Sequence, residues 1–275
     1  MTRPPGNPAE PNATAERGPP HAGTGTREPL LRVDRLGKDF GNFTAVREVS
    51  LDVRQGDLTA IIGPNGAGKT TLFNMLSGQL QPSRGRVLYR GQNIAQLPTY
   101  RLSHLGIGRS FQVTNVFRGL TVLENVRIAI QARLHRDYDF VRRAVSLVDT
   151  RQAAEQILET IGLGRYQRAP ASTLSHGDQR RLEVGIVLAA DPALVLLDEP
   201  TSGMSREEAR ATMALLHDIA CDRTVLFVEH NMEFVMAISR SIVVMQSGEV
   251  IAQGSPAEVR VDSTVRRAYL GSLYE

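Results

Sequence analysis

The residues with the most specific chemistry form a glycine-rich loop in the first third of the chain. An apolar run at 58–62 precedes the loop and predicts a buried parallel strand, and an apolar run at 72–76 follows it and predicts a helix. A strand, a glycine loop and a helix in this order are the context that a phosphate-binding loop requires. The loop consists of Gly63, Pro64, Asn65, Gly66, Ala67, Gly68, Lys69, Thr70 and Thr71.

The backbone N–H groups of such a loop point inward and bind the phosphates of a nucleoside triphosphate, and the helix N-terminus adds positive charge there. We predict that Thr70 gives its hydroxyl oxygen to Mg²⁺ and that Lys69 neutralises the phosphates as a compact cation. Only two of the 32 basic residues are lysines, Lys38 and Lys69. Because arginine is used almost everywhere else, a lysine inside the loop favours a nucleotide-triphosphate site over a chance glycine-rich turn.

Two adjacent carboxylates, Asp198 and Glu199, end an apolar run at 194–197. Ligands of open parallel sheets bind beyond the carboxyl ends of the strands. We therefore predict that Asp198 contacts Mg²⁺, directly or through water, and that Glu199 faces the attacking water as a general base. Without the glycine loop upstream, the same pair would be no more than an acidic strand end in solvent.

The rest of the chain supplies the elements that position these residues. Residues 1–29 hold seven of the 14 prolines and no apolar cluster, so we predict a disordered tail followed by one domain. Alternating runs between residues 31 and 89 predict an antiparallel part beside the nucleotide core. Apolar residues at helical spacing predict a helical subdomain over about 113–176, and strands alternating with a helix after residue 193 predict a parallel α/β sheet.

The composition limits the class of protein. A net charge of +3, with acidic residues interspersed among the arginines, predicts no nucleic-acid partner. The single cysteine, Cys221, excludes an intramolecular disulfide. No apolar run approaches the ~20 residues of a membrane-spanning helix, and the first residues lack the pattern of a secretory signal. We therefore expect a chain without a membrane span of its own.

A second candidate anion site begins a predicted helix roughly twenty residues before the two carboxylates. It combines a serine and a glycine at a helix N-terminus, and its Ser175 and Asp178 also have the spacing of a capping box. With these motifs in this order, the chain resembles the ATP-binding subunits of ABC transporters, whose signature is LSGGQ. The matching residues are Leu174, Ser175, His176, Gly177, Asp178 and Gln179. The resemblance implies that the signature of one subunit closes on the γ-phosphate held by the glycine loop of another.

The resemblance covers residues 30–275 and implies further roles one residue at a time. Phe40 matches the aromatic residue that stacks on adenine, and Val46 is counted with it among the ATP contacts. Gln112 matches the glutamine that senses Mg²⁺ and the attacking water. His230 matches the histidine that contacts the γ-phosphate.

Two positions depart from the family pattern. His176 replaces a glycine of the signature, and Ser205 ends a loop that many members end with aspartate.

Next to Gln112, the apolar residues Val116 and Phe117 are expected to be exposed and to bind a membrane partner.

Within the family, residues 106–126, 229–232, 254–259 and 268–271 most resemble the branched-chain amino acid importer ATPases. The resemblance implies an α/β fold: a RecA-like P-loop ATPase core with an antiparallel β subdomain and an inserted α-helical subdomain. It implies ATP hydrolysis, with ATP and Mg²⁺ as cofactors. The implied partners are two membrane permease subunits, a second ABC ATPase subunit in a homo- or heterodimer, and an extracytoplasmic solute-binding protein reached through the permease. The implied location is peripheral, on the cytoplasmic face of the inner membrane.

Other functions remain open from the sequence. Similar motifs occur in urea importers and in lipopolysaccharide-export ATPases. ABC ATPases that act on DNA or ribosomes usually carry long heptad arms or two fused cassettes, and this chain has neither. A P-loop kinase of a small molecule would leave residues 175–179 without a role.

Overall fold

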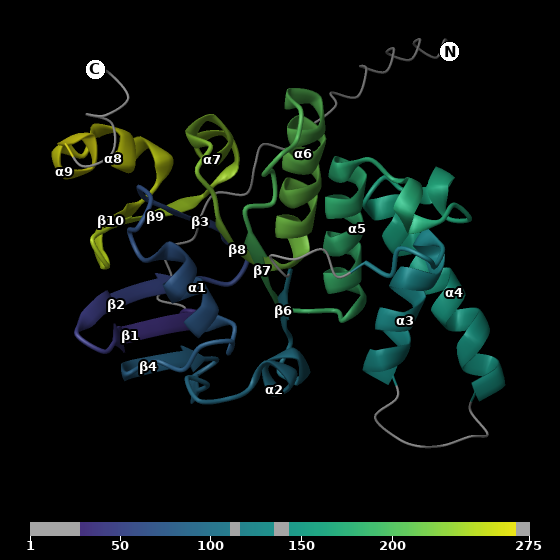
Figure 1. Ribbon diagram of the computed structural model, residues 1–275, viewed down its shortest axis with the longest axis horizontal. Helices are drawn as coiled ribbons and strands as arrows, with labels where there is room; N and C mark the ends of the chain where they lie inside the picture. The colour runs from purple at the N-terminus through teal and green to yellow at the C-terminus, as the bar shows by residue number, and fades with distance from the viewer. Residues whose placement is uncertain (1–27, 111–115, 135–142, 268–275) are drawn as a thin grey trace, which may run out of the picture.

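The computed structural model describes residues 28–110, 116–134 and 143–267, and two β-sheets form its framework (Figure 1). The predicted tail at 1–29 lies almost wholly outside these residues, and so do Gln112 and the first residues of the predicted helical subdomain. Within the described residues, no helix is both long enough and apolar enough to cross a bilayer.

The larger sheet has six strands in the order β10-β9-β3-β8-β7-β6, and all neighbours except β10 and β9 run parallel. All five residues in each of the central strands β3, β8 and β7 are buried, because both faces of this sheet are covered. The predicted apolar strands are thus confirmed. The bounds are β3 (Leu58–Ile62), β6 (Ile107–Arg109), β7 (Leu194–Asp198), β8 (Thr224–Val228), β9 (Ser241–Gln246) and β10 (Glu249–Gly254).

A tight turn joins β9 to β10. Ser247 and Gly248 both have positive φ, at 51° and 84°. Two successive residues with positive φ are characteristic of the type I′ turn, whose twist matches that of a two-stranded hairpin.

The smaller sheet is antiparallel and has the strand order β2-β1-β4-β5, which confirms the predicted antiparallel part. It lies beside the helix that follows the glycine loop (Figure 1). The bounds are β1 (Leu31–Phe40), β2 (Phe43–Val53), β4 (Arg84–Tyr89) and β5 (Gln92–Asn93).

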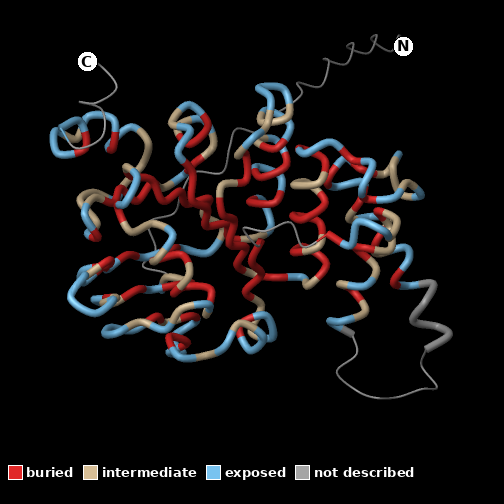
Figure 2. The backbone as a smooth tube through the Cα atoms, in the orientation of Figure 1, coloured by how far each residue is buried: buried red, intermediate tan, exposed pale blue. Residues whose placement is uncertain are grey.

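Neighbouring residues of the central strands belong to two different cores. Ala60 and Ile62 pack in a cluster with helices on one face of the large sheet, whereas Ile61 packs in a cluster with the antiparallel sheet on the other face. This alternation follows from the two-residue period of a strand. Figure 2 shows the central strands as a continuous buried layer between exposed outer elements.

Helices cover the faces and ends of the sheets. The sequence predicts the helices after residue 175 and after residue 205, and the structure confirms both. The bounds are α1 (Lys69–Leu76), α2 (Thr99–His104), α5 (His176–Ala189), α6 (Arg206–Asp222), α7 (Met232–Ile238), α8 (Pro256–Val261) and α9 (Ser263–Val265).

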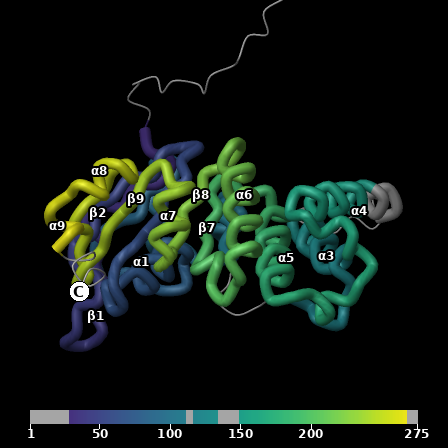
Figure 3. Tube along the Cα trace, turned by 90° about the horizontal axis from the view of Figure 1, so that it is seen from above, coloured from purple at the N-terminus to yellow at the C-terminus, as the bar shows by residue number. Residues whose placement is uncertain are grey.

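Between β6 and α5 the described residues form helices and turns. They include α3 (Val122–Leu134), α4 (Arg143–Thr160) and 3₁₀ turns at Gly164–Tyr166 and Ala171–Thr173. Together with α5, these helices make up one end of the molecule, opposite α8 and α9 (Figure 3). A capping box opens α3: the Thr121 backbone N–H donates to Glu124 Oε2 over 2.8 Å, and the Glu124 N–H donates to Thr121 Oγ1 over 3.2 Å.

The expectation that Val116 is exposed is wrong. Val116 is buried in the cluster with Val122 and Val126, because the residues before the cap fold back onto α3. Phe117 is 57% exposed, as expected. Its backbone is held by Asn125, whose side chain accepts from the Phe117 N–H over 2.8 Å and donates to the Phe117 carbonyl over 3.1 Å.

Candidate nucleotide site

The glycine loop lies between β3 and α1, and two of its glycines are required by its shape. Gly63 has a φ of 155°, and a Cβ there would lie 2.2 Å from the Met245 carbonyl oxygen. Gly68, the N-cap of α1, has a φ of 93°, and a Cβ there would lie 2.6 Å from the Ala45 carbonyl oxygen. Neither position accepts a side chain, so the loop is pressed closely against β9 and β2.

Lys69 is the first residue of α1, and its side chain folds back over the loop. Its Nζ donates to the carbonyl oxygens of Gly63 over 2.7 Å and Pro64 over 2.9 Å. Burial lowers the pKa of the Lys69 ammonium, and the carboxylates of Glu199 and Asp198 oppose that shift. The cation is thus held at the mouth of the loop, facing the two carboxylates that the sequence selects.

Asp198 ends β7 in a buried setting that the sequence did not predict. Its carboxylate lies 3.8 Å from the Arg109 guanidinium, and both side chains are less than 5% exposed. Burial raises the pKa of the Asp198 carboxyl, and Arg109 opposes that shift. Arg109 also donates to Asn74 Oδ1 over 2.7 Å and to Ser77 Oγ, so it joins β6 to the end of α1.

The predicted Mg²⁺ ligands fit a magnesium site in their chemistry. Asp198 Oδ2 is buried and has no hydrogen-bond partner in the described structure, whereas Thr70 exposes its hydroxyl-bearing side chain at the start of α1. Among the described residues, no group of three His, Cys, Asp or Glu side chains could hold a metal by itself. In nucleotide enzymes, one or two protein oxygens usually hold Mg²⁺ together with the phosphates.

Glu199 follows Asp198 in a strained conformation. Its φ is 46°, in the left-handed region that residues with a Cβ rarely adopt. The backbone N–H of Glu199 donates to the Val228 carbonyl over 3.0 Å, which fixes the turn against the end of β8. The side chain is partly exposed, and its Oε1 lies 3.9 Å from His230 Nδ1. The structure thus brings together two predicted site residues that are distant in the sequence.

Glu229 connects the loops that carry Glu199 and His230, and sequence reasoning missed it. It is fully buried. Its Oε1 accepts from the N–H of Thr201 over 3.0 Å and from the Thr201 hydroxyl. Its Oε2 accepts from the N–H groups of His230 and Asn231 over 3.0 and 3.3 Å. A glutamate at the end of an apolar strand was the only available signal.

The predicted ATP contacts Phe40 and Val46 lie on the paired strands β1 and β2 of the antiparallel sheet. Phe40 is 49% exposed at the end of β1, and Lys38 Nζ lies 5.3 Å from its ring centroid. Val46 is fully buried, and its Cγ2 lies 3.4 Å from the position that a Cβ on Gly68 would take. Val46 therefore packs beneath the loop. Gln112 lies outside the described residues.

The signature segment begins α5 about as predicted, with one difference. Ser175 is the N-cap, and its Oγ accepts from the Asp178 N–H over 3.1 Å. The Asp178 carboxylate pairs with Arg181 instead of returning to Ser175, so the predicted capping box is only half formed. Gln179 Nε2 donates to the Leu174 carbonyl over 3.0 Å and so closes the segment on itself.

Comparisons with known proteins identify the family of this chain. A model of the ABC transporter family matches residues 46–202, and a model of branched-chain amino acid ATP-binding cassette transporters matches residues 249–274. The chain belongs to the ABC transporter family.

Relatives match this ABC chain over most of its length. It is 38% identical over 253 residues to the high-affinity branched-chain amino acid transport ATP-binding protein LivG of Salmonella typhimurium, covering 89% of this chain and 98% of LivG. It is 36% identical over 250 residues to BraF of Pseudomonas aeruginosa, described in the same words, covering 88% and 98%. Among solved structures, an ATP-binding cassette of an ABC transporter in its ADP conformation matches with a TM-score of 0.78 at 30% identity, covering 89% and 100%.

Family membership makes this chain an ATP-binding, ATP-hydrolysing cassette with a RecA-like P-loop core. The ATPase subunits of this family pair with one another and with membrane permease subunits.

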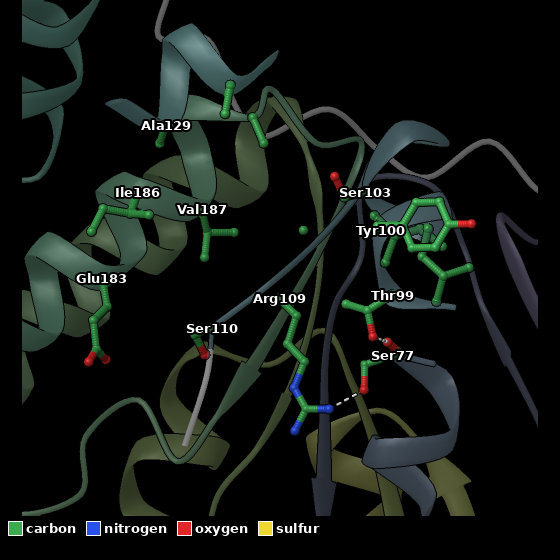
Figure 4. Close-up of a pocket in the computed structure, with 15 residues that line it drawn as sticks. Ser77, Thr99, Tyr100, Ser103, Arg109, Ser110, Ala129, Glu183, Ile186 and Val187 are labelled. Carbon is green, nitrogen blue, oxygen red and sulfur yellow. Dashed lines mark hydrogen bonds between the residues drawn. The ribbon is translucent and has the colours of Figure 1, made fainter. Parts of the chain in front are cut away.

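An apolar pocket of about 610 Å³ separates the ATPase core from the helical end of this ABC cassette. Side chains of α2, β6, α3 and α5 line it, and Figure 4 shows Arg109 and Ser110 at its inner wall. Ser110 Oγ accepts from the Asp198 backbone N–H over 3.3 Å. The pocket therefore shares two residues with the surroundings of the predicted metal ligand.

Proposed function

We propose that this chain is the ATP-hydrolysing subunit of an ABC importer that powers uptake of branched-chain amino acids. The observation that carries the catalytic part is the convergence of four side chains beyond adjacent parallel strands. Lys69 follows β3, Asp198 ends β7 and Glu199 comes directly after it, and His230 follows β8. Because β3, β8 and β7 are neighbours and run parallel, all four reach one edge of the sheet.

In this proposal, each residue has a separate role at the γ-phosphate. The glycine loop and Lys69 bind the phosphates, and Phe40 stacks on the adenine. Glu199 accepts a proton from the attacking water, which contributes roughly 10²–10⁴ in rate. His230 contacts the γ-phosphate, and Gln112 orients the water. Thr70 and Asp198 would hold Mg²⁺, which neutralises charge on the phosphates when bound.

The solute is inferred from the relatives. LivG and BraF carry branched-chain amino acid transport in their names, and the second family model matches the C-terminal 249–274 segment. The lipopolysaccharide export protein LptB of Acidithiobacillus ferridurans is 31% identical over 247 residues, covering 90% of this chain and 98% of LptB. The higher identities favour amino acid import over lipopolysaccharide export.

The assembly follows from the same proposal. The chain lies at the cytoplasmic face of the inner membrane and binds a pair of permease subunits, which receive the solute from an extracytoplasmic binding protein. A second ABC ATPase, identical or different, pairs with it. Ser175 and Gly177 of this chain complete the nucleotide site of that partner ATPase, because a helix N-terminus with free N–H groups binds anions. The partner's signature completes the site of Lys69 and Glu199.

We place the permease contact at the apolar pocket and at Phe117. The pocket lining includes Tyr100, Leu102, Ala129, Ile186 and Val187. An apolar side chain of the permease's cytoplasmic segment would be buried there, between the ATPase core and the helical end. Such a position allows movement of the helical end to reach the permease.

Transport by the reconstituted complex tests the solute. The chain is purified with its permease and partner ATPase, placed in vesicles with the binding protein, and supplied with ATP on the side of the ATPases. We expect ATP-dependent uptake of radiolabelled leucine, abolished by Lys69→Ala. Lys38→Arg, a change at the other lysine, should leave uptake near wild type. ATP-dependent uptake of urea but not leucine would overturn the solute assignment, and no ATP-dependent uptake of either would overturn import.

A further inference from the structure

Three helices begin with the same arrangement of an N-cap hydroxyl and a glutamate three residues later. They are α3 with Thr121 and Glu124, α6 with Ser205 and Glu208, and α8 with Ser255 and Glu258. In each, one carboxylate oxygen, Oε2, accepts from the backbone N–H and the hydroxyl of the N-cap, over 2.7 to 2.9 Å. This is the reciprocal capping box.

Glu208 differs from the other two because its second oxygen reaches another helix. Ser175 Oγ donates to Glu208 Oε1 over 3.1 Å. A hydrogen bond from the Gly177 N–H is among the contacts that lower the pKa of the Glu208 carboxyl, after the larger contributions of Ser205. The carboxylate lies so close to Gly177 that a Cβ there would be 2.5 Å from Oε1. The contacts described for Glu124 and Glu258 stay at their own caps.

A second contact joins the same two segments. The His176 ring lies against Gly203, whose added Cβ would be 3.2 Å from His176 Cε1. Gly203 belongs to the loop that leads from Glu199 to Ser205. The signature of this chain is therefore attached at two points to the loop that follows its own Glu199.

We propose that Glu208 is a positioning residue whose carboxylate occupies, in the open ATPase pair, the signature groups that take the partner's γ-phosphate in the closed pair. The proposal rests on the proposed role of Ser175 and Gly177 at the partner's nucleotide. The carboxylate and the γ-phosphate are both anions and compete for the same donors. Closure therefore requires Glu208 Oε1 to leave the donors of Ser175 and Gly177. The presence of Glu208 raises the ATP concentration that is needed to close the pair.

The competition also connects the two nucleotide sites. Glu208 Oε2 caps α6 through Ser205, and Ser205 ends the loop that starts at Glu199. When the phosphate displaces Oε1, the carboxylate moves while it still holds Ser205. ATP binding at the partner's site thus changes the loop that follows Glu199, because the charged Glu208 carboxylate contacts both segments. Serine replaces the family's aspartate at position 205, and Glu208 supplies the negative charge there instead.

Trapping of ATP in the transport complex tests the proposal. Both ATPase subunits carry the catalytic Glu→Gln change, which in this chain is Glu199→Gln, so that closed pairs retain ATP. The measurement is radiolabelled ATP retained after rapid gel filtration, as a function of ATP concentration. Glu208→Gln is compared with Glu258→Gln, which makes the same change in a capping box away from the signature.

We expect Glu208→Gln to lower the ATP concentration for half-maximal retention roughly threefold to tenfold, because a neutral amide still supports the cap but no longer repels the phosphate. The effect should shrink as ionic strength rises, since the partly exposed charge is screened. Glu258→Gln should match the parent complex. A purely structural role for Glu208 would give no such salt dependence.

The outcomes distinguish failure of the Glu208 proposal from failure of the proposed role of the signature at the partner's nucleotide. If Ser175→Arg leaves ATP retention at the partner's site unchanged, the signature does not act on the partner, and the proposed function of the signature fails. If Ser175→Arg abolishes retention but Glu208→Gln behaves like Glu258→Gln, only the competition by Glu208 is overturned. A rise in the required ATP concentration with Glu208→Gln would likewise overturn it.

Discussion

His230 Nδ1 lies 3.9 Å from Oε1 of Glu199, although the two residues follow different strands of the central sheet. Both side chains are partly exposed, and the Glu199 carboxylate interacts electrostatically with the Lys69 ammonium. The buried carboxylate of Glu229 fixes both supporting loops from behind.

Glu199→Gln should keep ATP affinity near wild type and slow hydrolysis by about 10²-fold or more, since the amide cannot accept the proton of the attacking water. Steady-state ATPase rates of the assembled complex and binding of a fluorescent ATP analogue check the two parts. The control is Glu207→Gln, an exposed glutamate on α6. A rate within about threefold of wild type would remove Glu199 as the base.

Glu229→Gln should destabilise the chain and slow hydrolysis together. Both carboxylate oxygens accept hydrogen bonds from backbone N–H groups. Whichever oxygen the glutamine NH₂ group replaced, that group would point at a buried backbone N–H donor. Leaving a buried donor unsatisfied costs about 1–3 kcal/mol. Urea unfolding of the purified chain measures the loss. Glu233→Gln, an exposed change four residues later, should have little effect. Equal stability of the two variants would contradict the role given to Glu229.

Phe117→Asp should leave the chain folded but prevent its assembly with the permease. The exposed ring contributes little to the core, while the Asn125 contacts fix its backbone, so a charge there acts on the docking surface. Co-purification with the permease and the thermal unfolding midpoint measure the two effects. Val261→Asp changes an apolar residue that is 69% exposed on α8, at the opposite end of the molecule, and should assemble normally. Normal assembly of Phe117→Asp would place the docking surface elsewhere.

The capping glutamates should make the fold sensitive to acid. Hydrogen bonds from Ser255 hold the pKa of Glu258 below its ordinary value of 4.5, and those from Thr121 do the same for Glu124. A carboxyl with a lowered folded-state pKa stabilises the fold above its unfolded pKa, and that contribution is lost as the pH falls through the folded pKa. The free energy of unfolding should therefore drop below about pH 4.5, and Glu258→Gln should drop less steeply than wild type.

Sequence alone was sufficient where one short segment carries both the chemistry and the element that presents it. The glycine loop is flanked by a strand and a helix within 20 residues, and Asp198 and Glu199 end a strand whose apolar run is unmistakable. Apolar runs of five residues predicted the central strands because both faces of that sheet are buried. The resemblance to ABC cassettes then supplied roles for isolated residues such as Phe40 and His230, whose local sequence favours no function.

Tertiary structure decided every relationship between segments that are far apart in the chain. Arg109 and Asp198, 89 positions apart, meet because β6 and β7 are paired, and nothing near either residue predicts a buried ion pair. Glu208 reaches Ser175 only because α5 and α6 begin side by side. Val116, an apolar residue a few positions before the cap of α3, could equally have been exposed. Its burial depends on how that segment folds onto α3, since periodicity specifies the spacing of apolar residues but not the surface that covers them.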